Sequence, residues 1–231
     1  MYPYPPQSMG FPAGRRHTVL AALPLHVLVR LQPSGSSTAR VLCEPVKAGP
    51  AAGAQAMVLY LSAFDAHLDA LWLGLAVEDY QVLPVASFSP DELVARHQGH
   101  LPYCLHLAWG AHDGRIAVRA QGDPVRLSSA RVAQVSASID SIPLDIGLAD
   151  LECHARLWEC AGLYAHAETA ARLEQLNPQQ RHRHAERAME RIPGRTEPGR
   201  EINQIALYDA ESAQWHFVAL DFLAEMVAGP R

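Results

Sequence analysis

The alternation of apolar and polar positions is clearest between residues 57 and 120, where it predicts a run of strands and helices. The apolar run 57–61 predicts a buried strand. Ser62 lies three residues before Asp65, which is the spacing of a helix N-cap. Apolar residues then recur at three- and four-residue steps, so we expect an amphipathic helix over 63–76 that packs on this strand.

A second strand and a short helix follow in the same stretch. Residues 80–88 predict a strand, and Pro84 favours an edge position because proline lacks the N–H that a central strand donates. Ser89 and Pro90 are residue types that begin helices, so we expect a short helix that ends near His97.

A hairpin is predicted next. Residues 101–109 alternate with a period of two, which places Tyr103 and Trp109 on the same face of a strand. Asp113-Gly114 predicts a two-residue turn into a return strand over 116–120. The order strand, helix, strand, helix, hairpin predicts an α+β fold with an antiparallel or mixed sheet and helices on one face.

We expect this sheet domain to cover residues 15–125, preceded by an arm. Residues 1–14 are rich in Pro, Tyr and Gly and have little to bury, so they predict an extended arm. Residues 25–31 and 39–43 predict two strands that pair across a Ser/Gly loop.

The apolar run near residue 20 is interrupted by proline and histidine, which argues against an export signal. No run reaches the roughly 20 apolar residues that a membrane span needs.

A helical region is expected over 126–193. Ser128 or Ser129 predicts the start of a helix that runs to about residue 139, and a long helix is expected over 146–176. Asn177-Pro178 predicts the start of a further helix that ends near residue 191. The last two helices would form a helical hairpin inserted in the C-terminal half.

The segment 201–231 predicts a final pair of strands. Residues 204–208 and 214–220 have the composition of strands and flank a short polar turn. We expect this hairpin to rejoin the sheet domain, which would make the helical region an insertion.

Composition narrows the class of protein. The chain has 231 residues, 49% of them hydrophobic and 19% charged, which is ordinary for a globular protein. A net charge of −5 favours neither a membrane-surface protein nor a general nucleic-acid binder. Four cysteines without a CxxC pair indicate reduced thiols and a cytoplasmic location. Arginine outnumbers lysine 18 to 1, which we attribute to a GC-rich bacterial genome.

The first candidate site is a group of potential metal ligands within 17 residues. Their spacing matches no zinc signature, and the 12 histidines of the chain make local clusters frequent. The alternative is therefore a set of unrelated strand and loop side chains. The residues are His97, His100, Cys104, His106, His112 and Asp113.

The second candidate site is the basic segment 178–200, which has six arginines and three glutamates. Three of the arginines are four residues apart, so they share a helix face that could contact phosphates. The alternative is a solvated helix whose arginines pair with Glu186 and Glu190. No aromatic residues interleave the arginines, which weakens a model of stacking on single strands. The arginines are Arg181, Arg183, Arg187, Arg191, Arg195 and Arg200.

Catalytic and cofactor motifs of the common kinds are absent: the chain has no GxSxG, HExxH, P-loop or GxGxxG. We therefore expect a non-catalytic subunit or adaptor of a bacterial cytoplasmic assembly, with a protein partner or self-association, no cofactor and no membrane. The first alternative is an RNA- or DNA-binding subunit of a nucleoprotein complex that uses the arginines of 181–200. The second is a hydrolase or metal enzyme that uses the cluster from His97 to Asp113.

Overall fold

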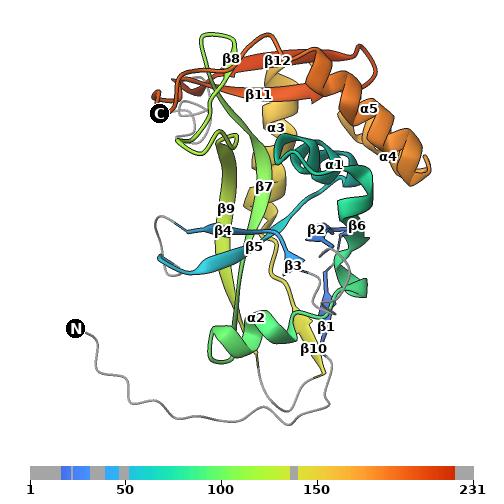
Figure 1. The fold of residues 1–231 in the computed structure, drawn as a ribbon, viewed down its shortest axis with the longest axis vertical. Coiled ribbons are helices and arrows are strands. Elements are labelled where there is room, and N and C mark those ends of the chain that lie inside the picture. The colour runs from blue at the N-terminus through green and yellow to red at the C-terminus, as the bar shows by residue number, and fades with distance from the viewer. Residues whose placement is uncertain (1–16, 22, 32–39, 47–51, 136–139, 222–231) are drawn as a thin grey trace.

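A computed structural model of the chain describes residues 17–21, 23–31, 40–46, 52–135 and 140–221 (Figure 1). The arm predicted over 1–14 lies outside the described residues, as does the end of the C-terminal segment from residue 222. The described part contains strands and helices in comparable amounts, which confirms the α+β class.

The strands are spread along the whole described chain, and the helices fall between them in two groups. The strands are β1 (Thr18–Leu20), β2 (His26–Arg30), β3 (Arg40–Val41), β4 (Cys43–Pro45), β5 (Gln55–Leu59), β6 (Tyr80–Pro84), β7 (His100–His112), β8 (Arg115–Ile116), β9 (Arg126–Gln134), β10 (Ser141–Pro143), β11 (Gln204–Asp209) and β12 (Gln214–Ala219). The helices are α1 (Ala63–Trp72), α2 (Asp91–Arg96), α3 (Leu148–Cys160), α4 (His166–Glu174) and α5 (Pro178–Glu190).

The large sheet is built around β7. Its order is β12-β11-β7-β5-β4, and β8 and β9 also pair with β7. β5 runs parallel to β7, whereas β9 and β11 run antiparallel to it, so the sheet is mixed. The terminal hairpin β11–β12 is therefore part of the same sheet as β7. No described helix is long and apolar enough to cross a membrane.

A smaller sheet has the order β3-β2-β6. β2 and β3 pair antiparallel at Val29 and Val41, which confirms the predicted pairing of these two segments. β6 lies at the edge of this sheet, as the missing N–H of proline predicts. It ends at Pro84 and does not reach residue 88 as expected, because Val85–Ser87 form a 3-10 turn. β1 and β10 form a separate parallel pair.

The prediction of helices on one face of the sheet is wrong. Ala206 of β11 packs in the same apolar cluster as α1 and α5, whereas its neighbours Ile205 and Leu207 pack with Leu157 of α3. Successive side chains of a strand point to opposite faces, so α3 covers one face and α1 with α5 covers the other. Both faces of β11 are apolar, and each therefore needs its own cover.

A β-bulge in β7 also changes the predicted faces. The register of β7 with β9 shifts between His106 and Ala108. Tyr103 consequently packs in the cluster with β2 and β5, whereas Trp109 packs on the opposite side with α1 and α5. Side chains alternate between the two faces of the sheet before and after the bulge. The extra residue shifts this alternation by one position, so residues after the bulge point to the face opposite to the one predicted.

The helix predicted to start at Ser128 or Ser129 and run to about residue 139 is wrong, because residues 126–134 form strand β9. It pairs with β7 from His100↔Gln134 to Trp109↔Arg126. Serine is a frequent helix cap, but here the nonlocal ladder with β7 satisfies the backbone instead. Residues 136–139 of the predicted helix lie outside the described part of the chain.

The long helix predicted over 146–176 is two helices, α3 and α4, separated at Gly162. This glycine has φ +77°, a left-handed conformation that glycine adopts without steric cost. The N–H of Gly162 donates to the carbonyl of Glu159 at 2.9 Å, and the N–H of Leu163 donates to that of Trp158 at 2.9 Å. These two bonds form a Schellman motif, which satisfies the last carbonyls of α3 and ends the helix.

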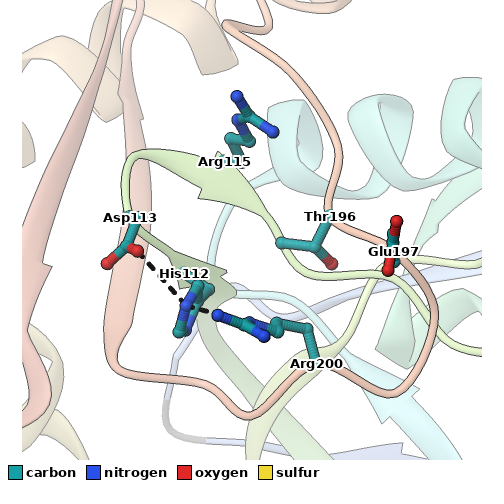
Figure 2. A pocket seen from close by; sticks show the side chains of 6 residues that line it. All are labelled: His112, Asp113, Arg115, Thr196, Glu197 and Arg200. Carbon is teal, nitrogen blue, oxygen red and sulfur yellow. Dashed lines mark hydrogen bonds and ion pairs between the residues drawn. The ribbon is translucent and has the colours of Figure 1, made fainter.

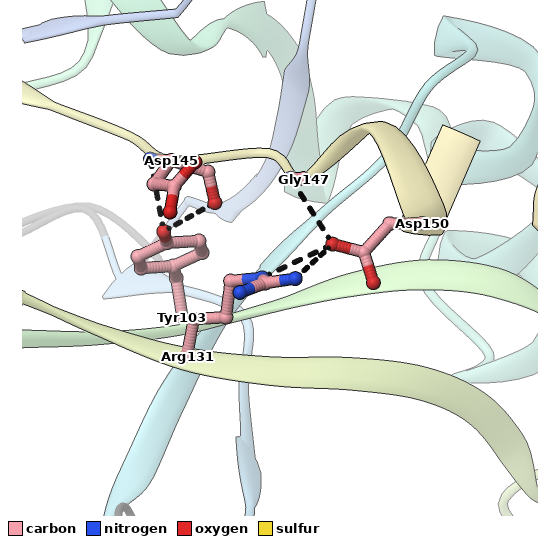
Figure 3. Close-up of polar contacts among 5 residues, drawn as sticks. All are labelled: Tyr103, Arg131, Asp145, Gly147 and Asp150. Carbon is pink, nitrogen blue, oxygen red and sulfur yellow. Dashed lines mark hydrogen bonds and ion pairs between the residues drawn. The ribbon is translucent and has the colours of Figure 1, made fainter. Parts of the chain in front are cut away.

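Polar contacts hold the segment before α3 against the sheet (Figure 3). The guanidinium of Arg131 on β9 donates to Asp150 Oδ2 from Nη2 at 2.6 Å and from Nε at 3.0 Å. The same oxygen accepts the N–H of Gly147, the N-cap of α3, at 3.2 Å. The Tyr103 hydroxyl donates to the carbonyl of Asp145 at 2.9 Å and accepts its N–H at 3.0 Å. The start of α3 is therefore tied to β7 and β9.

Candidate nucleic-acid interface

Helix α5 begins at the predicted residues. Asn177 is the N-cap, Pro178 is the first helical residue, and Asn177 and Gln180 form a reciprocal capping box. The N–H of Gln180 donates to Asn177 Oδ1 at 2.9 Å, and the N–H of Asn177 donates to Gln180 Oε1 at 3.1 Å. Ala185 and Ala188 are fully buried against α1, and such small side chains let two helices approach closely. The opposite face of α5 therefore points to solvent.

That exposed face has Arg183 and Arg187, and Arg191 follows as the C-cap residue, in steps of about 6 Å along the helix axis. Arg191 also donates from Nη1 to the carbonyl of Ala213 at 2.7 Å. The expected pairing of these arginines with glutamates is absent in the described chain. There, the ion pairs made by α5 are Arg181 with Glu174 and His182 with Glu186. The positive charges of the three arginines are therefore not neutralised by a described carboxylate within 4 Å.

Arg181 does not belong to this exposed face. Its side chain is 15% exposed, its Nη1 donates to the carbonyl of Glu174 at 3.1 Å, and the same nitrogen lies 3.6 Å from the Glu174 carboxylate. Glu174 also accepts the N–H of Ala63 at the start of α1. Arg181 thus links α4 to α5 and is not available for a ligand.

The segment after α5 runs beside β8 and has a further exposed arginine, Arg195. Ile116 donates its N–H to the carbonyl of Gly194 at 3.0 Å, and Thr196 donates its N–H to Ile116 at 3.0 Å. Between them, the Arg195 guanidinium lies 4.5 Å from the ring centroid of Trp72, a cation–π contact. The backbone ladder and the stacked ring hold this exposed arginine in place.

A tight turn positions Arg200. The turn from Glu197 to Arg200 contains Pro198, which sets its first corner, and Gly199 with φ +80°, and Arg200 donates its N–H to Glu197 at 3.4 Å. The Arg200 side chain donates from Nε to His112 Nε2 at 3.1 Å. Residues 88 positions apart in the chain thereby meet at the end of β7.

An open pocket of about 390 Å³ lies at this meeting point (Figure 2). Its described lining is polar or charged throughout. Asp113 is held by Asn203, which donates to Oδ1 at 2.9 Å. This hydrogen bond is the largest cause that lowers the pKa of Asp113. The lining residues are His112, Asp113, Arg115, Thr196, Glu197 and Arg200.

The six potential metal ligands predicted from the sequence are not brought together. His97 follows α2 and His100 begins β7, whereas His112 is the last residue of that strand and Asp113 follows it. A strand of 13 residues is about 40 Å long, so these two groups cannot share an ion. Among the residues that the structure describes, no group of three or more His, Cys, Asp or Glu side chains could hold a metal ion.

The middle two of these candidates, Cys104 and His106, are buried in the sheet. Burial, with Arg126 and His154 nearby, lowers the pKa of His106 to about 3. Its ring centroid lies 4.4 Å from that of Trp109 and 5.6 Å from that of Tyr60. Burial raises the pKa of the Cys104 thiol to about 11. Both side chains are therefore uncharged parts of the core.

A network of histidines and a tyrosine lies beneath α5 and was not predicted. The Tyr80 hydroxyl lies 2.9 Å from Nδ1 of His67 and 2.8 Å from Nδ1 of His182. A hydroxyl has a single proton, so it donates to one imidazole and accepts from the other. Burial, with Arg181 as the next cause, lowers the pKa of His67 to about 4. The network fixes α5 on α1 and β6.

The structure shows two residues beside these arginines that the sequence did not indicate. Arg115 reaches the pocket because β8 runs beside the 194–196 segment, and Trp72 reaches Arg195 because α1 packs on α5. Neither has a local sequence signal, since each contact joins residues about 80 to 120 positions apart. We call Arg183, Arg187, Arg191, Arg195 and Arg200 the arginine surface.

Comparisons of the chain with protein-family models, curated proteins and solved structures give no match. The function is therefore argued below from the geometry and charge of the arginine surface and its pocket.

Proposed function

We propose that the protein binds nucleic acid through the arginine surface, as a subunit of a nucleoprotein complex. The observation that carries this proposal is the exposed row Arg183, Arg187 and Arg191, which has no described carboxylate partner within 4 Å. One guanidinium group can donate two hydrogen bonds to two oxygens of a phosphate. Such phosphate contacts supply the sequence-independent part of nucleic-acid affinity.

The distribution of charge also supports a polyanion at this surface. Segment 178–200 has a net charge of +3, so the rest of the chain has −8. A nucleic acid is attracted to the first and repelled by the second, which restricts its position on the protein. Arg195 and Arg200, in the segment that follows α5, add two further exposed arginines that phosphates can contact.

The test is fluorescence anisotropy with labelled single- and double-stranded RNA and DNA at several salt concentrations. We expect affinity to fall steeply with salt, because each phosphate contact releases counterions. The variant with Arg183→Gln, Arg187→Gln and Arg191→Gln should bind weakly. It should also lower the slope of log K against log salt by about 2 to 3, since each contact contributes about 0.7 to 0.9.

The matched control is Arg172→Gln, which removes another exposed arginine from the neighbouring helix α4. Arg172 pairs with Glu211 at 2.7 Å, so it is already neutralised. Its replacement should leave affinity and slope unchanged. Equal binding by the native protein and the triple variant, or binding that is independent of salt, would rule out the proposal.

A second candidate function is the non-catalytic subunit or adaptor expected from the sequence. It is supported by β12, which forms an outer edge of the large sheet and pairs only with β11 within the described chain. An edge strand can extend its ladder to a strand of a partner. Sedimentation of the pure protein, with co-purification from its host, tests this candidate: a monomer that recovers no partner would exclude it.

A further inference from the structure

The pocket beside the arginine surface has groups suited to one phosphate of high charge. Arg200 uses its Nε on His112, and its two terminal nitrogens make no hydrogen bond to any described residue. Arg115 likewise makes no hydrogen bond or ion pair with its side chain in the described chain, and both arginines line the pocket. Figure 2 shows the two side chains extending in different directions, so Arg200 supplies paired guanidinium donors beside His112 and Arg115 adds positive charge at the rim of the pocket.

His112 positions one of these arginines. Its side chain is 18% exposed, and its Nε2 accepts the Nε–H of Arg200 at 3.1 Å. This bond fixes the plane of the guanidinium, so that the terminal nitrogens are held in a defined direction. Figure 2 shows His112 and Arg200 side by side, with Asp113 beyond the imidazole.

The two carboxylates of the pocket limit which anions can bind. Asp113 already accepts a hydrogen bond from Asn203, whereas Glu197 is exposed. With two arginines opposed by two acids, the pocket has too little net charge to attract a small anion strongly. A nucleic-acid strand that is already bound to the arginine surface has a high effective concentration at the pocket. Its phosphate can therefore bind there despite the low net charge of the pocket.

The form of the phosphate follows from charge and shape. A phosphodiester inside a strand has one negative charge, whereas a terminal phosphate monoester has about −1.5 to −2 at neutral pH. The volume of about 390 Å³ lies in the range of pockets for small ligands, so a single terminal nucleotide can enter. An internal phosphate would have to bring the chain on both of its sides into the concave site.

We infer that the pocket lined by Arg115, Arg200, His112 and Thr196 binds a terminal phosphate monoester of a nucleic-acid strand, an inference that rests on the proposed function. The arginine surface holds the strand, and the pocket selects its phosphorylated end. The same chemistry is present in a free mononucleotide, which the test therefore includes.

The experiment compares short oligonucleotides of one sequence with a 5′-phosphate, a 3′-phosphate or hydroxyls at both ends, by fluorescence anisotropy of the full chain. We expect one phosphorylated form to bind about tenfold or more tightly than the hydroxyl form, as two charge-assisted contacts would give. Arg115→Gln should reduce this preference and leave binding of the hydroxyl form nearly unchanged. Arg200→Gln should reduce the preference more strongly and also weaken the hydroxyl form, because Arg200 belongs to the arginine surface as well. Arg200→Lys, which keeps the charge but not the paired donors, should restore little of it.

Arg187→Gln is the matched control, because it should weaken all three oligonucleotides by the same factor. Equal affinity of the native protein for the three oligonucleotides would overturn the pocket inference and leave the proposed function standing. If no oligonucleotide binds, calorimetry with a nucleoside monophosphate decides between two outcomes. Binding that Arg200→Gln abolishes would support the phosphate pocket and overturn the proposed function, and no binding would overturn both.

Discussion

Arg126, the first residue of β9, donates two hydrogen bonds to Asp69 in the middle of α1. Nε lies 2.8 Å from Oδ2 and Nη2 lies 2.5 Å from Oδ1, and the Tyr60 hydroxyl donates to Oδ2 as well. Asp69 is fully buried, and the Arg126 side chain is 4% exposed. Burial disfavours the charge of Arg126, but Asp69 raises its pKa, so the arginine stays charged. The pair fastens α1 to the sheet.

Breaking this pair should destabilise the fold strongly. Arg126→Met leaves the Asp69 carboxylate buried without its partner, and we expect a loss of about 3–5 kcal/mol in the free energy of unfolding. Adding Asp69→Leu should recover part of this loss, because no buried charge then remains. Urea unfolding measures all three proteins, with Arg172→Met as the control, since the exposed Arg172–Glu211 pair should contribute less than about 1 kcal/mol. A loss below about 1 kcal/mol for Arg126→Met would contradict the assignment.

Stability should fall as pH decreases from about 6.5 towards 4. Burial is the largest cause that lowers the pKa of His67 and His154 to about 4 and that of His106 to about 3. These rings are neutral in the folded protein, whereas the unfolded chain takes up their protons near pH 6.5. Each should therefore lower the free energy of unfolding by about 1.4 kcal/mol per pH unit across this window. Urea unfolding between pH 7.5 and 4.5 measures the slope.

Two variants separate the contributions to this slope. His67→Asn should make it shallower by about 1.4 kcal/mol per pH unit, with the exposed His100→Gln as the control.

Asp65 acts in the opposite sense, because burial, with Asp69 and Glu174, raises its pKa to about 7. Its contribution is present when it is protonated and is lost as pH rises through about 7. Asp65→Asn should therefore make the slope between pH 4 and 6.5 steeper, and an unchanged slope in both variants would refute this account.

The glycine between α3 and α4 should resist substitution. No described atom lies within 4 Å of a Cβ built at Gly162, so Gly162→Ala is opposed only by its φ of +77°. We expect a loss of about 1 kcal/mol in the free energy of unfolding, measured by urea. Gly162→Asn should cost less, because asparagine tolerates this conformation better than alanine. Equal stability of the alanine variant and the native protein would show that the chain can leave the left-handed turn.

Two cysteines should react slowly while the protein is folded. Burial is the main cause that raises the pKa of Cys43 and Cys104 to about 11, so at pH 8 their thiolate fraction is about a hundredfold lower than that of a thiol with pKa 9. Timed alkylation with iodoacetamide, followed by peptide mass spectrometry, measures the rate at each site. The protein unfolded in urea is the control, in which all four thiols should react quickly. Rapid labelling of Cys104 in the folded protein would contradict its burial.

Features of the fold that depend on neighbouring residues were predicted correctly. The Ser62 hydroxyl accepts the N–H of Phe64 at 3.1 Å at the start of α1, and Asn177 with Pro178 begins α5. Asp113 and Gly114 have φ of +48° and +72° in the turn between β7 and β8, as the Asp-Gly pair predicts. In each case the residues that decide the conformation lie within three positions of one another.

The candidate site was predictable to a lesser extent. The exposed row of α5 follows from its four-residue spacing, but the sequence did not show that Arg181 is engaged by Glu174. Arg181 is half-buried because Glu174 reaches it from α4. The spacing of charges along one helix does not show which other helix packs on it. The presence of Arg115 and Arg200 in the lining of one pocket has the same kind of cause, since it depends on β8 lying beside the 194–196 segment.

The sequence by itself determined the α+β class, the starts of α1 and α5 and the turn after β7, because local hydrogen bonds and apolar spacing suffice for these. Only the tertiary structure decided that 126–134 is a strand, that the bulge exchanges the faces of β7, and that Arg200 meets His112. Each of these depends on partners far away in the chain. A segment with weak local preference takes the conformation that satisfies its backbone and buries its apolar side chains against those partners.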